Sequence, residues 1–365
     1  MEAALSLITD ILFVFFASFA ATLAVSLTRV RRESSDLNAK QASHSQPTPR
    51  IGGLGIVLAL VIGTFIWFAG EDSRQSQGLF LAVAMPLFFV GLAEDLGYFS
   101  SIKVRLLAAC FSGVLFVLVF GQWLPRLDIP LVDQMFMHSS FAIPFTIFAC
   151  VGVTHAFNLI DGLNGLSSFL AIGIAASLMA ISFQVGLDAH SEAMLLVIAA
   201  VAGFLLVNFP FGKVFLGDGG AYVLGHILVW TAVSIVWNDE SVSSFAILLI
   251  FFWPIADTLL AVWRRMIKRT DITQPDRLHF HQLVMRAIEI SALGQGRREL
   301  ANPLATVAII PIAVTPMSVG VLFWNNVQVT AGAAIFFFAI FFISYQIGIR
   351  WARRSRRSPP TKTKT

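Results

Sequence analysis

The stretch at residues 141–167, FAIPFTIFACVGVTHAFNLIDGLNGLS, joins an apolar run to a polar motif. A membrane-spanning helix needs roughly 20 apolar residues, and the run up to residue 157 comes close to that length before the polar residues begin. The stretch therefore predicts a membrane helix at about 141–157. The asparagine and aspartate residues directly after it predict a polar site at the membrane surface.

The composition of the whole chain points to the same class of protein. Hydrophobic residues make up 57% of the 365 residues and charged residues only 13%, with a mean hydropathy of +0.79. Apolar runs of spanning length recur, so the chain is predicted to be an all-α polytopic membrane protein with about eleven transmembrane helices. The predicted spans are about 4–26, 52–70, 78–93, 104–121, 141–157, 166–186, 190–208, 219–237, 243–263, 303–324 and 328–349.

The distribution of Lys and Arg predicts the orientation, because positively charged loops stay in the cytoplasm. With eleven spans and a periplasmic N-terminus, every Lys and Arg except Arg74 and Arg126 falls on the cytoplasmic side, together with the C-terminus. We expect one transmembrane domain over residues 1–351 and a disordered basic tail over residues 352–365. Basic flanks and anionic lipid headgroups explain the net charge of +4, so we expect no nucleic-acid partner.

The motif FNLIDGLNGLS can present a carboxylate between two amides. Asn158, Asp161 and Asn164 are three residues apart, and residues at that spacing share a face of a helix. Such a set suits a divalent cation or a ligand with many hydroxyl groups, and Gly162 and Gly165 allow a close approach of backbone or ligand. A helix end with an Asx cap and a turn explains the same residues.

A second glycine-rich motif, FLGDGGAYVLG, occupies residues 215–225. Asp218 stands before Gly219 and Gly220, where it is either a common N-cap residue or part of a ligand site. A helix N-terminus with glycines binds anions through its free N–H groups, and a carboxylate there recruits a magnesium ion that bridges to phosphate.

The acidic pair Glu94–Asp95 lies at the predicted cytoplasmic end of the third span. Adjacent carboxylates serve as metal ligands or as a general base, although charged residues also simply mark the ends of membrane helices. Lys103 and Arg105 follow across the same loop. They either neutralise the acidic pair or contact a phosphate.

The long loop before residue 303 contains His279 and His281. Their spacing places both imidazoles on one side of an extended segment but not of a helix. Phosphate contact or acid–base chemistry is the favoured role, with Arg277 alongside. Asp257 lies inside the ninth predicted span, where an acid is either functional or paired with a neighbouring helix.

Five of these motifs, in this order, resemble the polyprenyl-phosphate N-acetylhexosamine-1-phosphate transferases, the MraY/WecA-like superfamily. The resemblance covers roughly residues 47–283. The matching motifs are PTPRIGGLG (47–55), GLAEDL (91–96), NLIDGLNGL (158–166), FLGDGGAYVLG (215–225) and DRLHFHQL (276–283).

The resemblance implies an enzyme of the bacterial inner membrane with its active site on the cytoplasmic face. Members of the superfamily transfer a sugar 1-phosphate from a UDP-amino sugar to undecaprenyl phosphate and release UMP. They use Mg²⁺, for which we expect Mn²⁺ to substitute. The implied partners are the lipid acceptor, a UDP-N-acetylhexosamine-type donor and the bilayer, and a homodimer is a further expectation.

The resemblance also implies roles for single residues. Asp218 would be the main magnesium ligand, with the side-chain carbonyl of Asn158 as a second oxygen and Asp161 beside the metal and nucleotide. The acceptor phosphate would meet Asp95 or Glu94. The implied donor and phosphate contacts are His279, His281, Lys103, Lys213, Arg277, Gly219 and Asn164.

Three positions depart from the usual pattern of the superfamily. Glu94 replaces the first Asp of an Asp-Asp pair, Asn164 stands where many members have Asp, and Gln282 replaces the third His of HxHH. These differences resemble members that initiate O-antigen or exopolysaccharide chains. The alternatives are the phospho-N-acetylmuramoyl-pentapeptide transferase of peptidoglycan synthesis and, in another class, a secondary transporter or lipid flippase. Transporters place ionisable groups near the bilayer midplane on repeated, broken helices.

Overall fold

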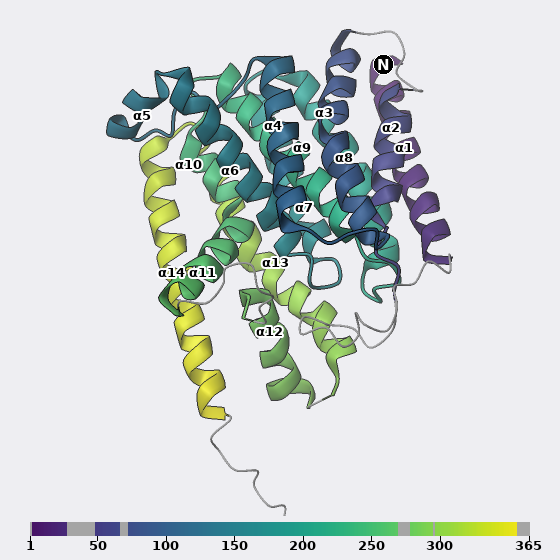
Figure 1. Ribbon diagram of the computed structural model, residues 1–365, viewed down its shortest axis with the longest axis vertical. Coiled ribbons are helices and arrows are strands. Elements are labelled where there is room, and N and C mark those ends of the chain that lie inside the picture. The colour runs from purple at the N-terminus through teal and green to yellow at the C-terminus, as the bar shows by residue number, and fades with distance from the viewer. Residues whose placement is uncertain (1, 28–47, 66–71, 269–277, 295, 356–365) are drawn as a thin grey trace, which may run out of the picture.

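The computed structural model is built around one helix, α9 (Gly217–Asn238), which lies at the centre of the bundle (Figure 1). The apolar span of this helix is fully buried inside the bundle, and Trp230 and Tyr222 are among the largest fully buried side chains. A helix that is apolar on all sides must be enclosed by other helices. Helices α2, α3, α6 and α7 pack around it.

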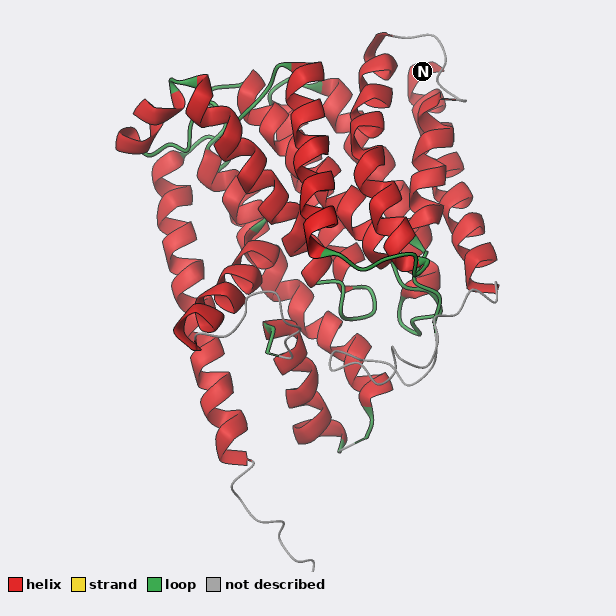
Figure 2. Cartoon of the chain, viewed as in Figure 1, coloured by secondary structure: helices red, strands yellow, loops and turns green. Residues whose placement is uncertain are grey.

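The structure describes residues 2–27, 48–65, 72–268, 278–294 and 296–355. Helices joined by turns and loops account for these residues, and no strand occurs among them (Figure 2). The elements are α1 (Glu2–Leu27), α2 (Gly53–Phe65), α3 (Asp72–Asp95), α4 (Ile102–Phe120), α5 (Pro130–Phe136), α6 (Ser139–Leu159), α7 (Leu166–Gln184), α8 (Asp188–Asn208), α9, α10 (Ser244–Ile250), α11 (Phe252–Lys268), α12 (Phe280–Ile288), the π-helix η1 (Glu289–Leu293), α13 (Arg298–Leu322) and α14 (Val327–Ser355).

The described residues of each of the eleven predicted spans are mainly helical, which confirms the all-α polytopic membrane fold; residues 66–70 of the second span lie outside the described residues. Nine of the described helices are long and apolar enough to cross a membrane, and α2 is a shorter apolar helix. The span predicted at 243–263 is divided into two helices, because α10 and α11 meet there at a bend of 81°. Pro254 has no N–H to donate to the carbonyl of Ile250, so α10 ends at Ile250 and α11 leaves in a new direction.

The loop predicted between residues 264 and 302 is also more ordered than expected. It contains α12 and η1, both of which pack against α13. The predicted tail begins inside α14, which continues to Ser355. Residues 356–365 lie outside the described residues.

Pairs of glycines bring the first turn of α9 close to its neighbours. A Cβ atom added at Gly91 of α3 would lie 2.6 Å from the Cα of Gly219. A Cβ atom at Gly220 would lie 2.6 Å from the Cα of Gly53 in α2. Small residues allow helix backbones to approach this closely in membrane proteins. The N-terminus of α9 is therefore held between α2 and α3.

The glycine-rich motifs also pair through their backbones at this end of the bundle. The Phe215 N–H donates to the Pro49 carbonyl at 2.8 Å, and the N–H groups of Gly52 and Gly53 donate to the carbonyls of Phe215 and Leu216 at 2.9 and 2.8 Å. PTPRIGGLG and FLGDGG thus form one backbone unit in front of α9. Which side of a membrane this end faces remains a prediction.

Candidate active site

The carboxylate of Asp95, at the end of α3, accepts hydrogen bonds from the first turn of α9. Its Oδ1 lies 2.9 Å from the backbone nitrogen of Asp218, and its Oδ2 lies 2.9 Å from that of Gly219. The first N–H groups of a helix have no partner within the helix, so Asp95 acts as a cap supplied by another helix. The sequence allowed two roles for Asp218, an N-cap residue or a ligand. Asp218 lies inside the first turn of α9, and Asp95 provides the cap.

Arg105, on α4, links the two acids next to Asp95. Its Nε lies 3.4 Å from Oε2 of Glu94, and its Nη1 lies 3.5 Å from Oδ2 of Asp218. The same Nη1 donates to the hydroxyl of Tyr222 at 3.3 Å. Of the two sequence alternatives for Arg105, the structure favours neutralisation of the acids.

The side chain of Asp218 is the most accessible acid of this group. It is 27% exposed, whereas that of Glu94 is 6% exposed, and Asp95 is buried. Asn158 approaches from α6, where its Nδ2 donates to the Tyr222 hydroxyl at 3.0 Å. Because the amide nitrogen of Asn158 makes this hydrogen bond, its side-chain carbonyl oxygen is available for other contacts. We call Glu94, Asp95, Arg105, Asn158, Asp218 and Tyr222 the acidic cluster.

Asp161 lies in the loop between α6 and α7, on the edge of the acidic cluster. Its Oδ1 accepts a hydrogen bond from the Ser167 hydroxyl at 2.6 Å. Burial raises the pKa of Asp161 to about 6, while the Ser167 hydrogen bond and the charge of Arg50 act in the opposite direction and the charge of Asp218 adds to the rise. Asp161 and Asp218 are thus close enough to influence each other.

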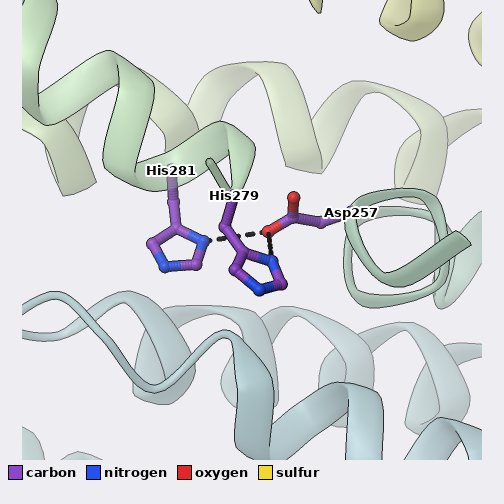
Figure 3. Close-up of side chains that lie close together, drawn as sticks. All are labelled: Asp257, His279 and His281. Atoms are coloured by element: carbon purple, nitrogen blue, oxygen red, sulfur yellow. Dashed lines mark hydrogen bonds and ion pairs between the residues drawn. The ribbon is translucent and has the colours of Figure 1, made fainter. Parts of the chain in front are cut away.

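Asp257, His279 and His281 form a second group, which we call the histidine cluster (Figure 3). Asp257 comes from α11, and the histidines stand at the start of α12. Oδ2 of Asp257 lies 2.9 Å from Nδ1 of His281 and 3.4 Å from Nδ1 of His279. His281 lies in the first turn of α12 and His279 directly before that helix. The common carboxylate brings the two imidazoles together despite the helix.

The loop at Gly162 joins the two clusters. A Cβ atom added at Gly162 would lie 2.9 Å from Nε2 of His281. The imidazole therefore rests against the glycine that follows Asp161 in the chain. The close approach expected at Gly162 is made by this protein side chain.

Asn164 has a different environment from Asn158 and Asp161. It is buried, its N–H donates to Oδ1 of Asn302 at 2.7 Å, and its Nδ2 donates to the Pro210 carbonyl at 2.8 Å. Its own carbonyl accepts from the Thr306 hydroxyl at 2.8 Å. These contacts tie the loop after α6 to α13 and to the segment that precedes α9.

The remaining predicted residues are partly placed. Lys103 and Lys213 are exposed, Gly219 contributes its N–H to Asp95, and Gln282 is buried. Arg277 lies outside the described residues.

Sequence reasoning missed Tyr222, which meets both Arg105 and Asn158. The residue lies inside an apolar helix, and its only signal was a hydroxyl placed four positions after Asp218. Arg50 was also missed as a positive charge that acts on Asp161, although it lies in one of the motifs, because its proximity depends on the fold.

The two clusters offer different donors to a metal ion. The acidic cluster provides carboxylate and amide oxygens, which are the ligands that Mg²⁺ and Ca²⁺ prefer. The histidine cluster is the one group of three His, Cys, Asp or Glu residues, in the described ranges, whose ligand atoms lie within 4.8 Å of one another. Imidazole nitrogens favour zinc and other transition metals. The residues at Asp218 and Asn158 therefore fit magnesium, and the histidine cluster does not.

Comparison with known proteins gives one family and a set of bacterial relatives. The model of glycosyl transferase family 4 matches residues 78–236. A probable undecaprenyl-phosphate N-acetylglucosaminyl 1-phosphate transferase of Bacillus subtilis is 30% identical over 248 residues, which are 66% of this chain and 67% of that protein.

Two further relatives extend this picture. The undecaprenyl-phosphate alpha-N-acetylglucosaminyl 1-phosphate transferase of Escherichia coli K12 is 28% identical over 344 residues, 88% of this chain and 89% of that protein. A phospho-N-acetylmuramoyl-pentapeptide-transferase of Staphylococcus carnosus is 30% identical over 229 residues, 59% of this chain and 69% of that protein.

Proposed function

Because the chain belongs to glycosyl transferase family 4 and to the superfamily of its undecaprenyl-phosphate transferase relatives, we propose that it transfers an N-acetylhexosamine 1-phosphate to undecaprenyl phosphate. The donor is a UDP-amino sugar and the second product is UMP. The product is the first lipid-linked intermediate of an O-antigen, exopolysaccharide or other envelope glycan. The names of the relatives support the lipid acceptor and the class of the reaction.

The reaction joins the acceptor phosphate to the β-phosphate of the donor and separates that β-phosphate from the α-phosphate. An oxygen of the acceptor phosphate attacks the β-phosphorus of the UDP-sugar, and the bond between that phosphorus and the bridging oxygen breaks. The bridging oxygen leaves with UMP, and the lipid carries a sugar diphosphate. Both reactants are anions, so positioning and charge neutralisation provide most of the catalysis.

Asp218 and the carbonyl oxygen of Asn158 would hold Mg²⁺, with Asp161 beside them. When bound, the ion would neutralise charge on the donor diphosphate, and Mn²⁺ would do the same. The exposure of Asp218 and the oxygen donors of the acidic cluster support this assignment. Arg105 would keep the Asp218 carboxylate in place before the ion binds.

Asp95 and Glu94 face the acceptor phosphate in this account. Because both oxygens of Asp95 already accept N–H groups of α9, we assign it the task of orienting that helix end toward the acceptor. A proton on the attacking oxygen would pass to Glu94 or Asp95.

The histidine cluster would bind the donor diphosphate. His281 rests on the Gly162 loop, beside Asp161, so a diphosphate at the acidic cluster would lie within reach of an imidazole. Lys103, Lys213 and Arg277 are proposed as further phosphate contacts.

The observation that carries the proposal is the convergence of these motifs at one end of the bundle. Asp95, Asp218 and Asn158 come from three helices, and the Gly162 loop connects them to His281. A transporter would gather its polar groups near the bilayer midplane. We propose that this end faces the cytoplasm of a bacterial inner membrane, with the N-terminus in the periplasm.

Transfer of phospho-N-acetylmuramoyl-pentapeptide is the second candidate, because the relative from Staphylococcus carnosus carries that name. It differs from the first proposal in the donor and not in the bonds made and broken. One assay therefore separates them.

The test is UMP release by purified protein supplied with undecaprenyl phosphate, Mg²⁺ and one donor at a time. UDP-GlcNAc, UDP-GalNAc, UDP-QuiNAc and UDP-MurNAc-pentapeptide form the panel, each with and without EDTA. We expect release with one amino-sugar donor and none with EDTA. Release only with UDP-MurNAc-pentapeptide would replace the first proposal by the second, and no release from folded protein would contradict both.

A further inference from the structure

Asp257 is a buried carboxylate whose hydrogen bonds all converge on the start of α12. It is 1% exposed. Its Oδ1 accepts the backbone N–H of Phe280 at 2.8 Å, and its Oδ2 lies 2.9 Å from Nδ1 of His281. Oδ2 is also 3.4 Å from Nδ1 of His279. Figure 3 shows both imidazoles turned toward this one side chain.

The contact with Asp257 decides which nitrogen of His281 carries a proton. A carboxylate only accepts hydrogen bonds, so Nδ1 of His281 must be the protonated nitrogen. The partner of one ring nitrogen sets the state of the other in this way. Nε2 is left at the opposite side of the ring, buried and without a hydrogen-bond partner in the part of the chain that the structure describes.

Nε2 of His281 points toward the loop between α6 and α7, which carries Asp161. It would lie 2.9 Å from a Cβ atom at Gly162, and Asp161 is the residue before that glycine. The ring is stacked with His279, with 5.5 Å between the ring centroids. Asp257 thus holds two stacked imidazoles against the loop between α6 and α7.

Arg264 holds the other end of the same segment. It lies seven residues after Asp257 on α11, a spacing that places both on one face of the helix. Its Nη1 donates to the carbonyl of Leu278 at 2.9 Å and to the hydroxyl of Tyr345 at 2.6 Å. The turn from Leu278 to His281 is therefore fastened to α11 at both ends.

We propose that Asp257 is a positioning residue for donor binding: it accepts the Nδ1–H of His281 and holds the ring so that Nε2, when the ring carries both protons, donates to the diphosphate of the UDP-sugar. This inference rests on the proposed function, because it needs an anionic donor next to the Gly162 loop. Asp257 itself does not touch the substrate. It acts through the orientation of the imidazole and by accepting its Nδ1 proton.

Asp257→Asn tests the inference with little change in shape. The amide oxygen can still accept the Phe280 N–H, but the amide nitrogen cannot accept a proton from Nδ1 of His281. We expect kcat/KM for the UDP-sugar to fall about 10- to 100-fold, while KM for undecaprenyl phosphate changes less than about threefold. Asp257→Glu should recover part of the loss.

A double-mutant cycle with His281→Gln separates positioning from a structural role. If Asp257 acts through His281, adding Asp257→Asn to His281→Gln should lower kcat/KM for the UDP-sugar by less than about threefold, because the effects of coupled residues are not additive. Additive losses would overturn the proposal. Glu289→Gln is the matched control, because Glu289 is also a buried acid near α12. Its carboxylate accepts the Gly296 N–H and pairs with Arg298, and not with a histidine. This variant should leave the donor kinetics unchanged.

Nitrogen NMR of ¹⁵N-labelled histidine gives a reading that does not depend on turnover. The ¹⁵N signal that disappears in His281→Gln belongs to the ring of His281. In the wild type this signal should show a proton on Nδ1, and in Asp257→Asn it should show the proton on the other ring nitrogen. The proposal would be overturned if the His281 tautomer in Asp257→Asn were the same as in the wild type. It would also be overturned if the wild type bound stoichiometric zinc and Asp257→Asn did not. Failure of the wild type to release UMP would contradict the proposed function alone, and the NMR result would still decide the state of His281.

Discussion

Asp95 holds the backbone of Asp218: its Oδ1 accepts the Asp218 N–H at 2.9 Å, although the two residues are 123 positions apart in the chain. Its Oδ2 accepts the next N–H, that of Gly219. One carboxylate therefore satisfies two of the free donors at the start of α9. The result is a fixed position for the Asp218 side chain, which we propose as a metal ligand.

Asp95→Asn should lower both stability and activity. The amide nitrogen of Asn would then face one N–H of α9, and that N–H would lose its hydrogen bond to a charged group. We expect the free energy of unfolding to fall by about 1.5–3 kcal/mol. Because the position of Asp218 depends on this contact, we expect turnover to fall about 100-fold or more. Thermal unfolding and UMP release measure the two effects; an unchanged unfolding temperature would show that Asp95 does not cap α9.

Asp218→Asn should lower activity by orders of magnitude with little change in stability. The side chain is 27% exposed and its partner Arg105 keeps its contact with Glu94, so the loss of one charge should change stability little. Binding of a divalent cation depends on that charge. The measurement is UMP release over a range of Mg²⁺ concentrations, beside thermal unfolding. Wild-type activity at saturating Mg²⁺ would contradict the ligand assignment.

Gly162→Ala should impair the reaction by pushing on His281. The new Cβ atom would lie 2.9 Å from Nε2, closer than ordinary contact, so the ring or the loop must move. We expect kcat/KM for the donor to fall about tenfold or more, since displacement of about 1 Å in a site has large effects. Gly152→Ala on α6 is the control, because a Cβ there meets no atom within 4 Å. Equal kinetics of the two variants would contradict contact between the loop and His281.

Asn164→Ala should act mainly on stability. It removes the hydrogen bond from Nδ2 to the Pro210 carbonyl and leaves that carbonyl without its donor. We expect the free energy of unfolding to fall by about 1–3 kcal/mol. Thermal unfolding and the donor KM distinguish this role from the substrate contact predicted from sequence. A large rise in KM with unchanged stability would favour the substrate contact.

The helices could be predicted from the sequence because a bilayer demands long apolar runs, and the described residues follow those runs closely. The bend between α10 and α11 was less visible, since Pro254 inside an apolar run is compatible with either a kink or a straight span. α12 was hidden because its amphipathic pattern covers only nine residues at the end of a polar segment.

The motifs of the candidate site were visible in the sequence, but their mutual contacts were not. Asp257 could be identified as an unusual acid in a membrane helix, and its partners only became clear when α11 and α12 were seen together. The contacts of Arg105 with Asp218 and Tyr222 join helices more than 100 residues apart. Such distances follow from the packing of whole helices, which no short pattern records.

The most direct test of the central claim is the fate of the two phosphates of the donor. UDP-sugar labelled with ³²P in the β-phosphate should transfer its label to the organic phase together with undecaprenyl phosphate. Label in the α-phosphate should remain in water as UMP. Transfer of the β-label would support phosphosugar transfer; retention of both labels in UDP, with the sugar alone in the lipid phase, would contradict it.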